Sequence, residues 1–177
     1  VGFDSGVDSD IPVTTVTTDN AKAAGEAADQ MAKLIGDAGK VAVIVHDQTS
    51  KTGQDRRDGF VNQMKAKHPN IEVVAIEYGA GDPVKSADFA KAIMTANPDL
   101  KGFFGANEGS IKGVLNALKE TGKEGKVVAI GYDSGQQQID AINAGTQAGA
   151  ITQNPVGIGA KCVSAAMDAI AGKSMDK

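Results

Sequence analysis

Residues 127–135 read VVAIGYDSG, a short apolar run that ends in one carboxylate beside glycine. Runs of this length, rich in valine and isoleucine and bounded by glycine, are typical of strands buried on both faces. Two further apolar runs end in a polar residue near glycine or proline, one at Asn107 and one at Gln153. Ligands bind outside the carboxyl ends of the strands in an open parallel sheet, so Asn107, Asp133 and Gln153 are predicted to converge on one polar site.

The rest of the chain repeats this alternation of apolar runs and amphipathic stretches. Asp19-Asn20, Thr49 or Ser50, and Asp82-Pro83 are good helix starts, and Gly36 and Asn97 are good stops. The pattern predicts strands at 41–45, 71–78, 103–106, 127–132 and 148–152, with helices at 19–35, 50–67, 83–96, 109–121, 136–144 and 155–171. Strands that alternate with helices of this length predict an α/β fold, a three-layer α/β/α sandwich with a mainly parallel sheet.

Composition narrows the possible functions. A chain of 177 residues with 41% hydrophobic content is long enough for one packed domain, or for one domain and a piece of another. The net charge is −4, and lysine and arginine are scattered among acidic residues, so no nucleic-acid partner is expected. Cys162 is the only cysteine, which excludes an internal disulfide and a Cys-His zinc site. No apolar run of about 18 residues is present.

Two stretches resemble catalytic or cofactor-binding motifs, but neither has the required residues at the required positions. In residues 131–135, GYDSG, the serine is fourth, whereas a nucleophile elbow needs it third. The glycines at 157 and 159 lack the third glycine of a dinucleotide fingerprint, because Cys162 stands there. We therefore expect no enzyme, no cofactor and no metal site.

Several short motifs, in their order and spacing, carry a family resemblance over almost the whole chain. The chain resembles the C-terminal part of the ribose-binding-protein-like periplasmic sugar receptors, which are type I solute-binding proteins of ABC importers. The motifs are Phe3-Asp4-Ser5-Gly6, Asp19-Asn20, Arg56-Arg57-Asp58-Gly59-Phe60, Asn97-Pro98-Asp99, Asn107-Glu108, Gly131-Tyr132-Asp133 and Gln153-Asn154-Pro155.

The resemblance implies a fold of the periplasmic-binding-protein-like I type, in which a sugar is held between two hinged lobes. Its sugar-contacting residues fall on Asp4, Arg56, Asn107, Asp133 and Gln153. Ser5 stands where the family often has arginine, and Glu108 where an aspartate is usual. The residue types suit the task, because sugar hydroxyls need an acceptor carboxylate, a donor guanidinium and amides that do both.

Each of these residues also has an ordinary structural interpretation. Arg56 lies in a charge run on a helix, and such runs are usually solvated. Asp133 and Asn107 could each cap the helix that follows. Gln153 could be a loop residue held by backbone hydrogen bonds.

The resemblance also implies a domain division and partners. Residues 1–9 would end a first-lobe strand and cross the hinge, 10–153 would form the C-terminal ligand-binding lobe, and 154–177 would cross back as a helix of the first lobe. The chain would then be half of a clamp that binds monosaccharide weakly alone. Its partners would be a small-molecule sugar and a membrane permease, in the periplasm or on a lipid anchor outside a Gram-positive cell. Self-association could occur through the apolar face of the last helix, at Ile158, Cys162, Val163, Ala166 and Ile170.

Two other function classes stay open. The effector-binding core of a lactose-repressor-type regulator shares this architecture, and it would need a helix-turn-helix elsewhere. A flavodoxin-like enzyme or signalling domain rests on fold analogy alone.

Overall fold

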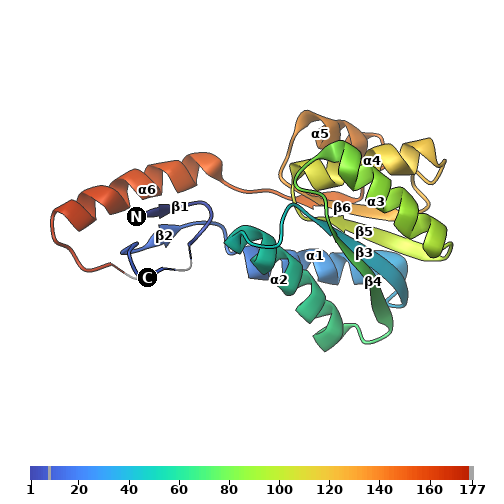
Figure 1. Cartoon of the computed structure of the whole chain (residues 1–177), viewed down its shortest axis with the longest axis horizontal. Coiled ribbons are helices and arrows are strands. Elements are labelled where there is room, and N and C mark those ends of the chain that lie inside the picture. The colour runs from blue at the N-terminus through green and yellow to red at the C-terminus, as the bar shows by residue number, and fades with distance from the viewer. Residues whose placement is uncertain (8, 176–177) are drawn as a thin grey trace.

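The chain forms a main body around one sheet and a smaller unit that lies to one side of it (Figure 1). The computed structural model describes residues 1–7 and 9–175. Residues 8, 176 and 177, which belong to the predicted end segments, lie outside the described residues. Both ends of the described chain lie in the smaller unit.

Every strand pair of the main sheet is parallel among the described residues, where a mainly parallel sheet was predicted. Its strands follow the order β4-β3-β5-β6-β7, with β3 at the point where the order reverses. In register, Val43 of β3 pairs with Ile76 on one side and Phe104 on the other, and Phe104 pairs with Ile130. The strands are β3 (Gly39–Val45), β4 (Ile71–Tyr78), β5 (Leu100–Gly105), β6 (Val128–Tyr132) and β7 (Gly149–Ile151).

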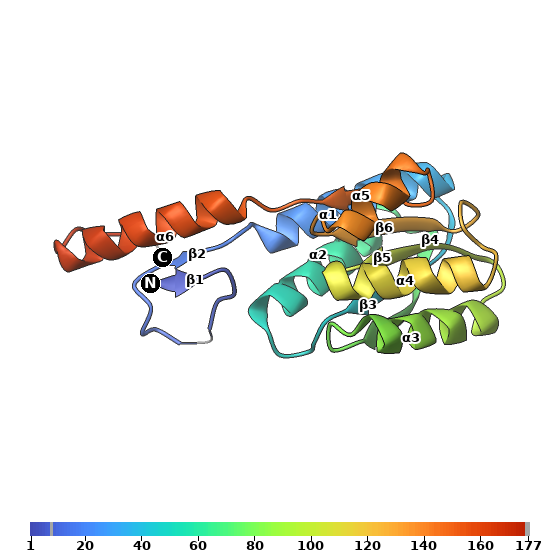
Figure 2. The same ribbon diagram turned by 90° about the horizontal axis from the view of Figure 1, so that it is seen from above.

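Helices cover both faces of this sheet, which gives the predicted three layers (Figure 2). On one face α1 (Asn20–Ile35) and α2 (Lys51–Lys67) enclose a core in which Phe60 stacks on Phe104, with ring centroids 4.6 Å apart. On the other face α3 (Pro83–Ala96) and α4 (Glu108–Glu120) pack on Phe103, and α5 (Gln136–Asn143) lies beside α4. Successive strand residues point to opposite faces, so Phe103 and Phe104 serve the two cores.

Side-chain caps fix where most helices begin, and they confirm the starts read from the sequence. Asp19 caps α1, Ser50 rather than Thr49 caps α2, and Asp82 caps α3 with Pro83 in its first turn. Strand β5 begins at Leu100, three residues before the predicted start, because Leu100 and Gly102 are buried beside β3. None of the helices in the described ranges is long and apolar enough to cross a membrane.

The smaller unit holds three elements from the two ends of the chain. Strand β1 (Gly2–Phe3) pairs in parallel with β2 (Thr15–Val16), and α6 (Pro155–Ile170) packs against them, where the Cys162 thiol lies 3.4 Å from the Gly2 carbonyl oxygen. Because β2 belongs here, the main body begins at α1 and not at residue 10, where the sequence division placed it. Residues 17–19 and 152–154 connect the two parts.

Candidate functional site

The carboxyl ends of the strands meet at the edge of the sheet from which the chain leaves toward the smaller unit. The connection after β3 leads through α2 to β4, and the one after β5 leads through α4 to β6 on the opposite side. Such a reversal of strand order opens a crevice between the two connections, where ligands bind in open α/β sheets. Asn107 follows β5, Asp133 follows β6 and Gln153 lies two residues beyond β7.

Arg56 lies beneath this edge and is only 4% exposed. Its Nε donates to Asn20 Oδ1 at 2.8 Å, and its Nη1 donates to the Ala106 carbonyl oxygen at 2.9 Å. The guanidinium carbon lies 3.7 Å from the centre of the Tyr132 ring, a cation–π contact. The interpretation of Arg56 as a solvated surface residue is therefore wrong. Nη2 donates to none of the described residues.

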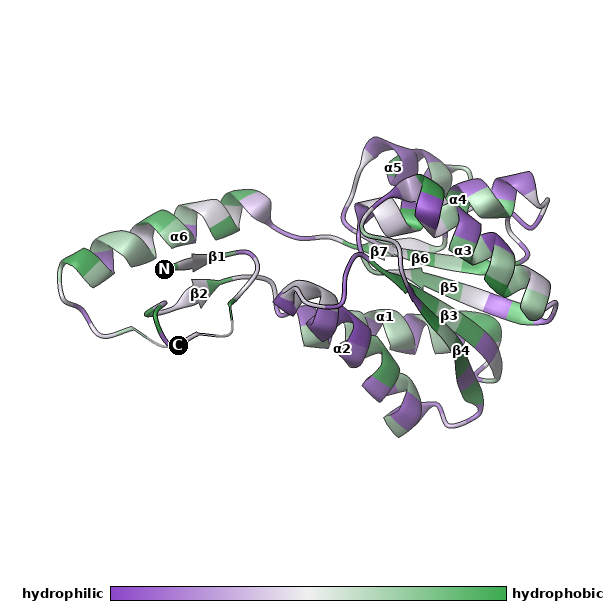
Figure 3. Ribbon diagram, viewed as in Figure 1, coloured by the Kyte–Doolittle hydropathy of each residue, from purple (hydrophilic) through white to green (hydrophobic). Residues whose placement is uncertain are grey.

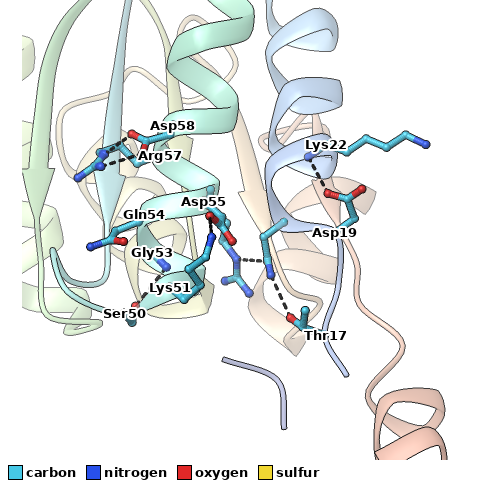
Figure 4. Close-up of polar contacts among 12 residues, drawn as sticks. Thr17, Asp19, Lys22, Ser50, Lys51, Gly53, Gln54, Asp55, Arg57 and Asp58 are labelled. Atoms are coloured by element: carbon cyan, nitrogen blue, oxygen red, sulfur yellow. Dashed lines mark hydrogen bonds and ion pairs between the residues drawn. The ribbon is translucent and has the colours of Figure 1, made fainter. Parts of the chain in front are cut away.

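Two residues that complete this cluster were missed by the sequence reasoning. The Tyr132 hydroxyl donates to Asn20 Oδ1 at 2.9 Å, and Asn20 Nδ2 donates to the Thr18 carbonyl oxygen at 2.9 Å. Both residues stand in motifs that carry the family resemblance, but the sequence reasoning gave neither of them a role in the site. Figure 4 shows the start of α1, with Thr17 and Asp19, beside the start of α2, with Ser50 and Gly53. The cluster thus joins both helix starts to the ends of β5 and β6.

Asp133 and Gln153 are in direct contact. Gln153 Nε2 donates to Asp133 Oδ1 at 2.7 Å, and Gln153 Oε1 accepts a hydrogen bond from the Thr18 hydroxyl at 2.9 Å. Asp133 Oδ2 accepts the backbone N–H of Glu108 at 3.0 Å. Asp133 does not cap the following helix, whose N-cap, Gly135, makes no side-chain bond. Gln153 is held by side chains and not by backbone groups, because it spans the two connecting segments.

Asn107 caps the helix that follows it, α4, which confirms the structural interpretation given above for this residue. Its Oδ1 accepts the Ser110 N–H at 2.9 Å. Its Nδ2 donates to none of the described residues, and it lies 3.4 Å from where a Cβ at Gly81 would stand. The cap therefore uses the oxygen and leaves the amide hydrogens of Asn107 available to a ligand.

His46 follows β3 at the same edge. Its Nε2 lies 3.0 Å from Ser50 Oγ, and its Nδ1 is buried without a partner among the described residues. Burial lowers the pKa of His46, and the positive charge of Arg56 lowers it further. Both effects favour the uncharged form of the ring.

Asp4 follows β1 in the smaller unit. It has a left-handed backbone (φ 58°) and lines, with Asn20 and Thr52, a cavity of about 450 Å³ between the smaller unit and the helix starts. Within the described chain its carboxylate makes no hydrogen bond to the other candidates. A separate groove of about 600 Å³ runs between α1 and α2, past Glu26 and Asp55, away from the strand ends.

The edge therefore offers hydrogen-bonding groups of both kinds. Arg56 Nη2 and Asn107 Nδ2 are donors without a partner among the described residues, and the Asp133 oxygens are acceptors. No group of three or more residues that could hold a metal ion occurs in the part of the chain that the structure describes. Such a set of fixed donors and acceptors can bind a neutral compound rich in hydroxyl groups.

Comparison with known proteins adds independent findings. The family described as periplasmic binding protein domain matches residues 1–174. The chain is 32% identical over 155 residues to the D-allose-binding periplasmic protein of Escherichia coli K12, covering 87% of this chain and 50% of that protein. It is 30% identical over 163 residues to the ribose import binding protein of the same organism, covering 92% and 54%.

Solved structures give the same result. An ABC transporter solute-binding protein from Agrobacterium vitis, bound with α-D-tagatopyranose, has a TM-score of 0.89 and 33% identity, covering 97% of this chain and 57% of that one. A carbohydrate transporter solute-binding protein from Agrobacterium radiobacter, in complex with D-arabinose, has a TM-score of 0.91 and 31% identity, covering 98% and 60%. The chain spans about half the length of the curated relatives it matches.

Proposed function

The chain belongs to the periplasmic binding protein domain family, in its type I sugar-binding branch, and from this premise we propose that it is one lobe of a monosaccharide receptor for an ABC-type importer. The relatives and neighbours named above are binding proteins, and we propose no enzymatic activity for this chain. A periplasmic location, or an extracellular one on a lipid anchor, goes with this proposal.

The observation that carries the proposal is the hydrogen-bonded edge at the strand ends. Asp133 and Gln153 are joined there, and Arg56 bonds to the carbonyl of Ala106, the residue before Asn107. Asp133 and Arg56 would be the anchors, because hydrogen bonds to charged groups contribute about 1.5–3 kcal/mol. The amides of Asn107 and Gln153 would distinguish epimers. Asp4 would contribute from the connecting segment when the site closes.

The ligand, in this proposal, is enclosed between the main body and a second lobe. The smaller unit would be the edge of that lobe, and the connecting segments at 17–19 and 152–154 would be two strands of the hinge. Hinge closure around a ligand would then present both lobes to a membrane permease. The main body supplies one wall of the site, so this chain by itself should bind monosaccharide weakly.

The smaller unit supports this interpretation through its open apolar surface. On α6, Val163 is 66% exposed and Ile170 is 82% exposed, whereas Ile158 and Cys162 are half-buried. Figure 3 shows hydrophobic residues along α6, interspersed with hydrophilic ones. Exposed apolar surface that forms a patch marks an interaction site. We propose that a second lobe covers it and that the chain alone self-associates there, which analytical ultracentrifugation would detect as a dimer lost in a Val163→Lys, Ile170→Lys variant.

The transport receptor is favoured over a lactose-repressor-type regulator because the relatives named above are binding proteins of transporters.

A thermal-shift screen tests the proposal. The protein with both lobes is heated with pentoses, hexoses, deoxy sugars and polyols, beside Asp133→Ala and the matched exposed control Asp88→Ala. One sugar or a few related ones should raise the Tm of the parent and of Asp88→Ala, but not that of Asp133→Ala. If no compound of the panel raised the Tm of the parent, the proposal of a sugar receptor would be refuted.

A further inference from the structure

Glu108 stands next to Asn107 at the first position of α4 and is bonded to the loop that carries Asp133. Its carboxylate Oε2 accepts the Gly135 N–H at 3.0 Å and Gln138 Nε2 at 2.6 Å. Its own N–H is donated to Asp133 Oδ2 at 3.0 Å. The residue and the loop thus exchange hydrogen bonds in both directions, as a capping box does at a helix start.

The partner groups are themselves fixed. Gln138 is fully buried, and its Nε2 also donates to the Tyr132 carbonyl oxygen at 2.9 Å. Gln147 Nε2 donates to Gln138 Oε1 at 2.9 Å, which sets the orientation of the Gln138 amide. Buried polar groups that are nearly all paired in this way form rigid networks.

Two glycines make room for the network. A Cβ at Gly135 would collide with the Glu108 carboxylate, and a Cβ at Gly131 would collide with the Gln138 amide oxygen. The close approach of the loop to Glu108 therefore depends on the missing side chains. Asp133 itself has φ 73°, a left-handed conformation that costs energy in a residue other than glycine and persists only when its surroundings hold it.

We propose that Glu108 is a positioning residue of the ligand site, which acts through Asp133. Its carboxylate holds the loop at 133–135 against α4, so that Asp133 keeps its strained backbone and presents its oxygens to the ligand without rearrangement. This inference rests on the proposed sugar-binding function. It assigns a role to a residue that contacts no ligand.

A comparison of three variants tests it. Glu108→Ala removes the acceptor, so Gln138 Nε2 keeps only its bond to the Tyr132 carbonyl oxygen and the Gly135 N–H is left unpaired. Glu108→Gln can place its oxygen where Oε2 stands and so keep both bonds. Glu120→Ala, an exposed glutamate at the other end of the same helix, is the matched control. Because the loop that carries Asp133 would then have to be ordered on binding, Glu108→Ala should weaken affinity for the sugar found by thermal shift by about 10-fold.

Affinity should be restored to within about 3-fold of the parent in Glu108→Gln and should be unchanged in Glu120→Ala. Equal affinity of Glu108→Ala and the parent would overturn the proposal.

A readout without ligand separates this inference from the proposed function. The amide of residue 108 is retained in every variant and donates to Asp133, so its hydrogen exchange reports whether Asp133 stays in place. Exchange should be about 10-fold faster in Glu108→Ala and unchanged in Glu108→Gln. Unchanged protection in Glu108→Ala would refute the positioning role even if no sugar bound the parent.

Discussion

Replacing Arg56 with methionine tests whether the buried guanidinium holds the sheet edge together. Methionine has similar length and no charge, so it fills the space while removing the bonds to Asn20 and Ala106 and the contact with Tyr132. Two hydrogen bonds from a charged donor contribute about 3–6 kcal/mol, and the cation–π contact adds about 0.5–2 kcal/mol.

Methionine carries no charge, so the variant avoids the cost of burying the Arg56 guanidinium, and this offsets part of the loss. We expect a net loss of about 3 kcal/mol in the free energy of unfolding, or about 1.5 M in the urea midpoint for a slope of about 2 kcal/mol/M. Urea unfolding followed by circular dichroism measures it.

The neighbouring residue provides the control. Arg57 also carries hydrogen bonds, to Asp58 at 2.6 Å and to the Tyr78 hydroxyl at 3.0 Å, but its side chain is 25% exposed. Exposed pairs contribute little, so Arg57→Met should cost less than about 1 kcal/mol. A loss below about 1 kcal/mol in Arg56→Met, or equal losses in the two variants, would refute the structural role of Arg56.

Two further predictions concern the packing of α1 on α2. His68 bonds to Asp29 across these helices, and this contact raises its pKa, so His68→Gln should destabilise the protein most below about pH 6.5 and progressively less as the pH rises through the raised pKa. Chemical denaturation between pH 5 and pH 9 measures the difference. Gly59→Ala should cost about 1–3 kcal/mol, because its Cβ would collide with the backbone of α1 at Ala21, whereas Gly159→Ala in α6 has open space and should stabilise by about 0.4–1 kcal/mol.

Each of these predictions has a clear contrary result. A stability difference between the parent and His68→Gln that stays constant with pH would show that the Asp29 contact does not favour the charged imidazole. Equal effects of the two glycine substitutions would show that helix propensity, and not the close approach of α1 and α2, decides the outcome.

Much of the fold could be predicted because its signals are local. The buried strands and capped helices depend on neighbouring residues, and Ser50 and Asp82 cap the helices that the sequence assigned to them. The start of the main body could not be predicted, because β2 has only two residues and its place depends on pairing with β1.

Only part of the candidate site could be predicted from the sequence, because some of its contacts join residues that are far apart in the chain. The convergence of Asp133 and Gln153 follows from the parallel sheet. The burial of Arg56 does not, because a charge run on a helix carries no sign of the partner that will cover it. Asn20 reaches Arg56 over 36 positions and Tyr132 over 112, and no local pattern encodes such contacts.

The location of the bound ligand tests the account most directly. The two-lobed protein, labelled with ¹⁵N, is titrated with the sugar that raises its Tm most, and chemical-shift changes are mapped along the chain. The account predicts that the largest changes in this lobe fall at Asn107, Asp133 and Gln153, including their side-chain amides. Changes confined to the groove between α1 and α2, or none at the strand ends, would contradict it.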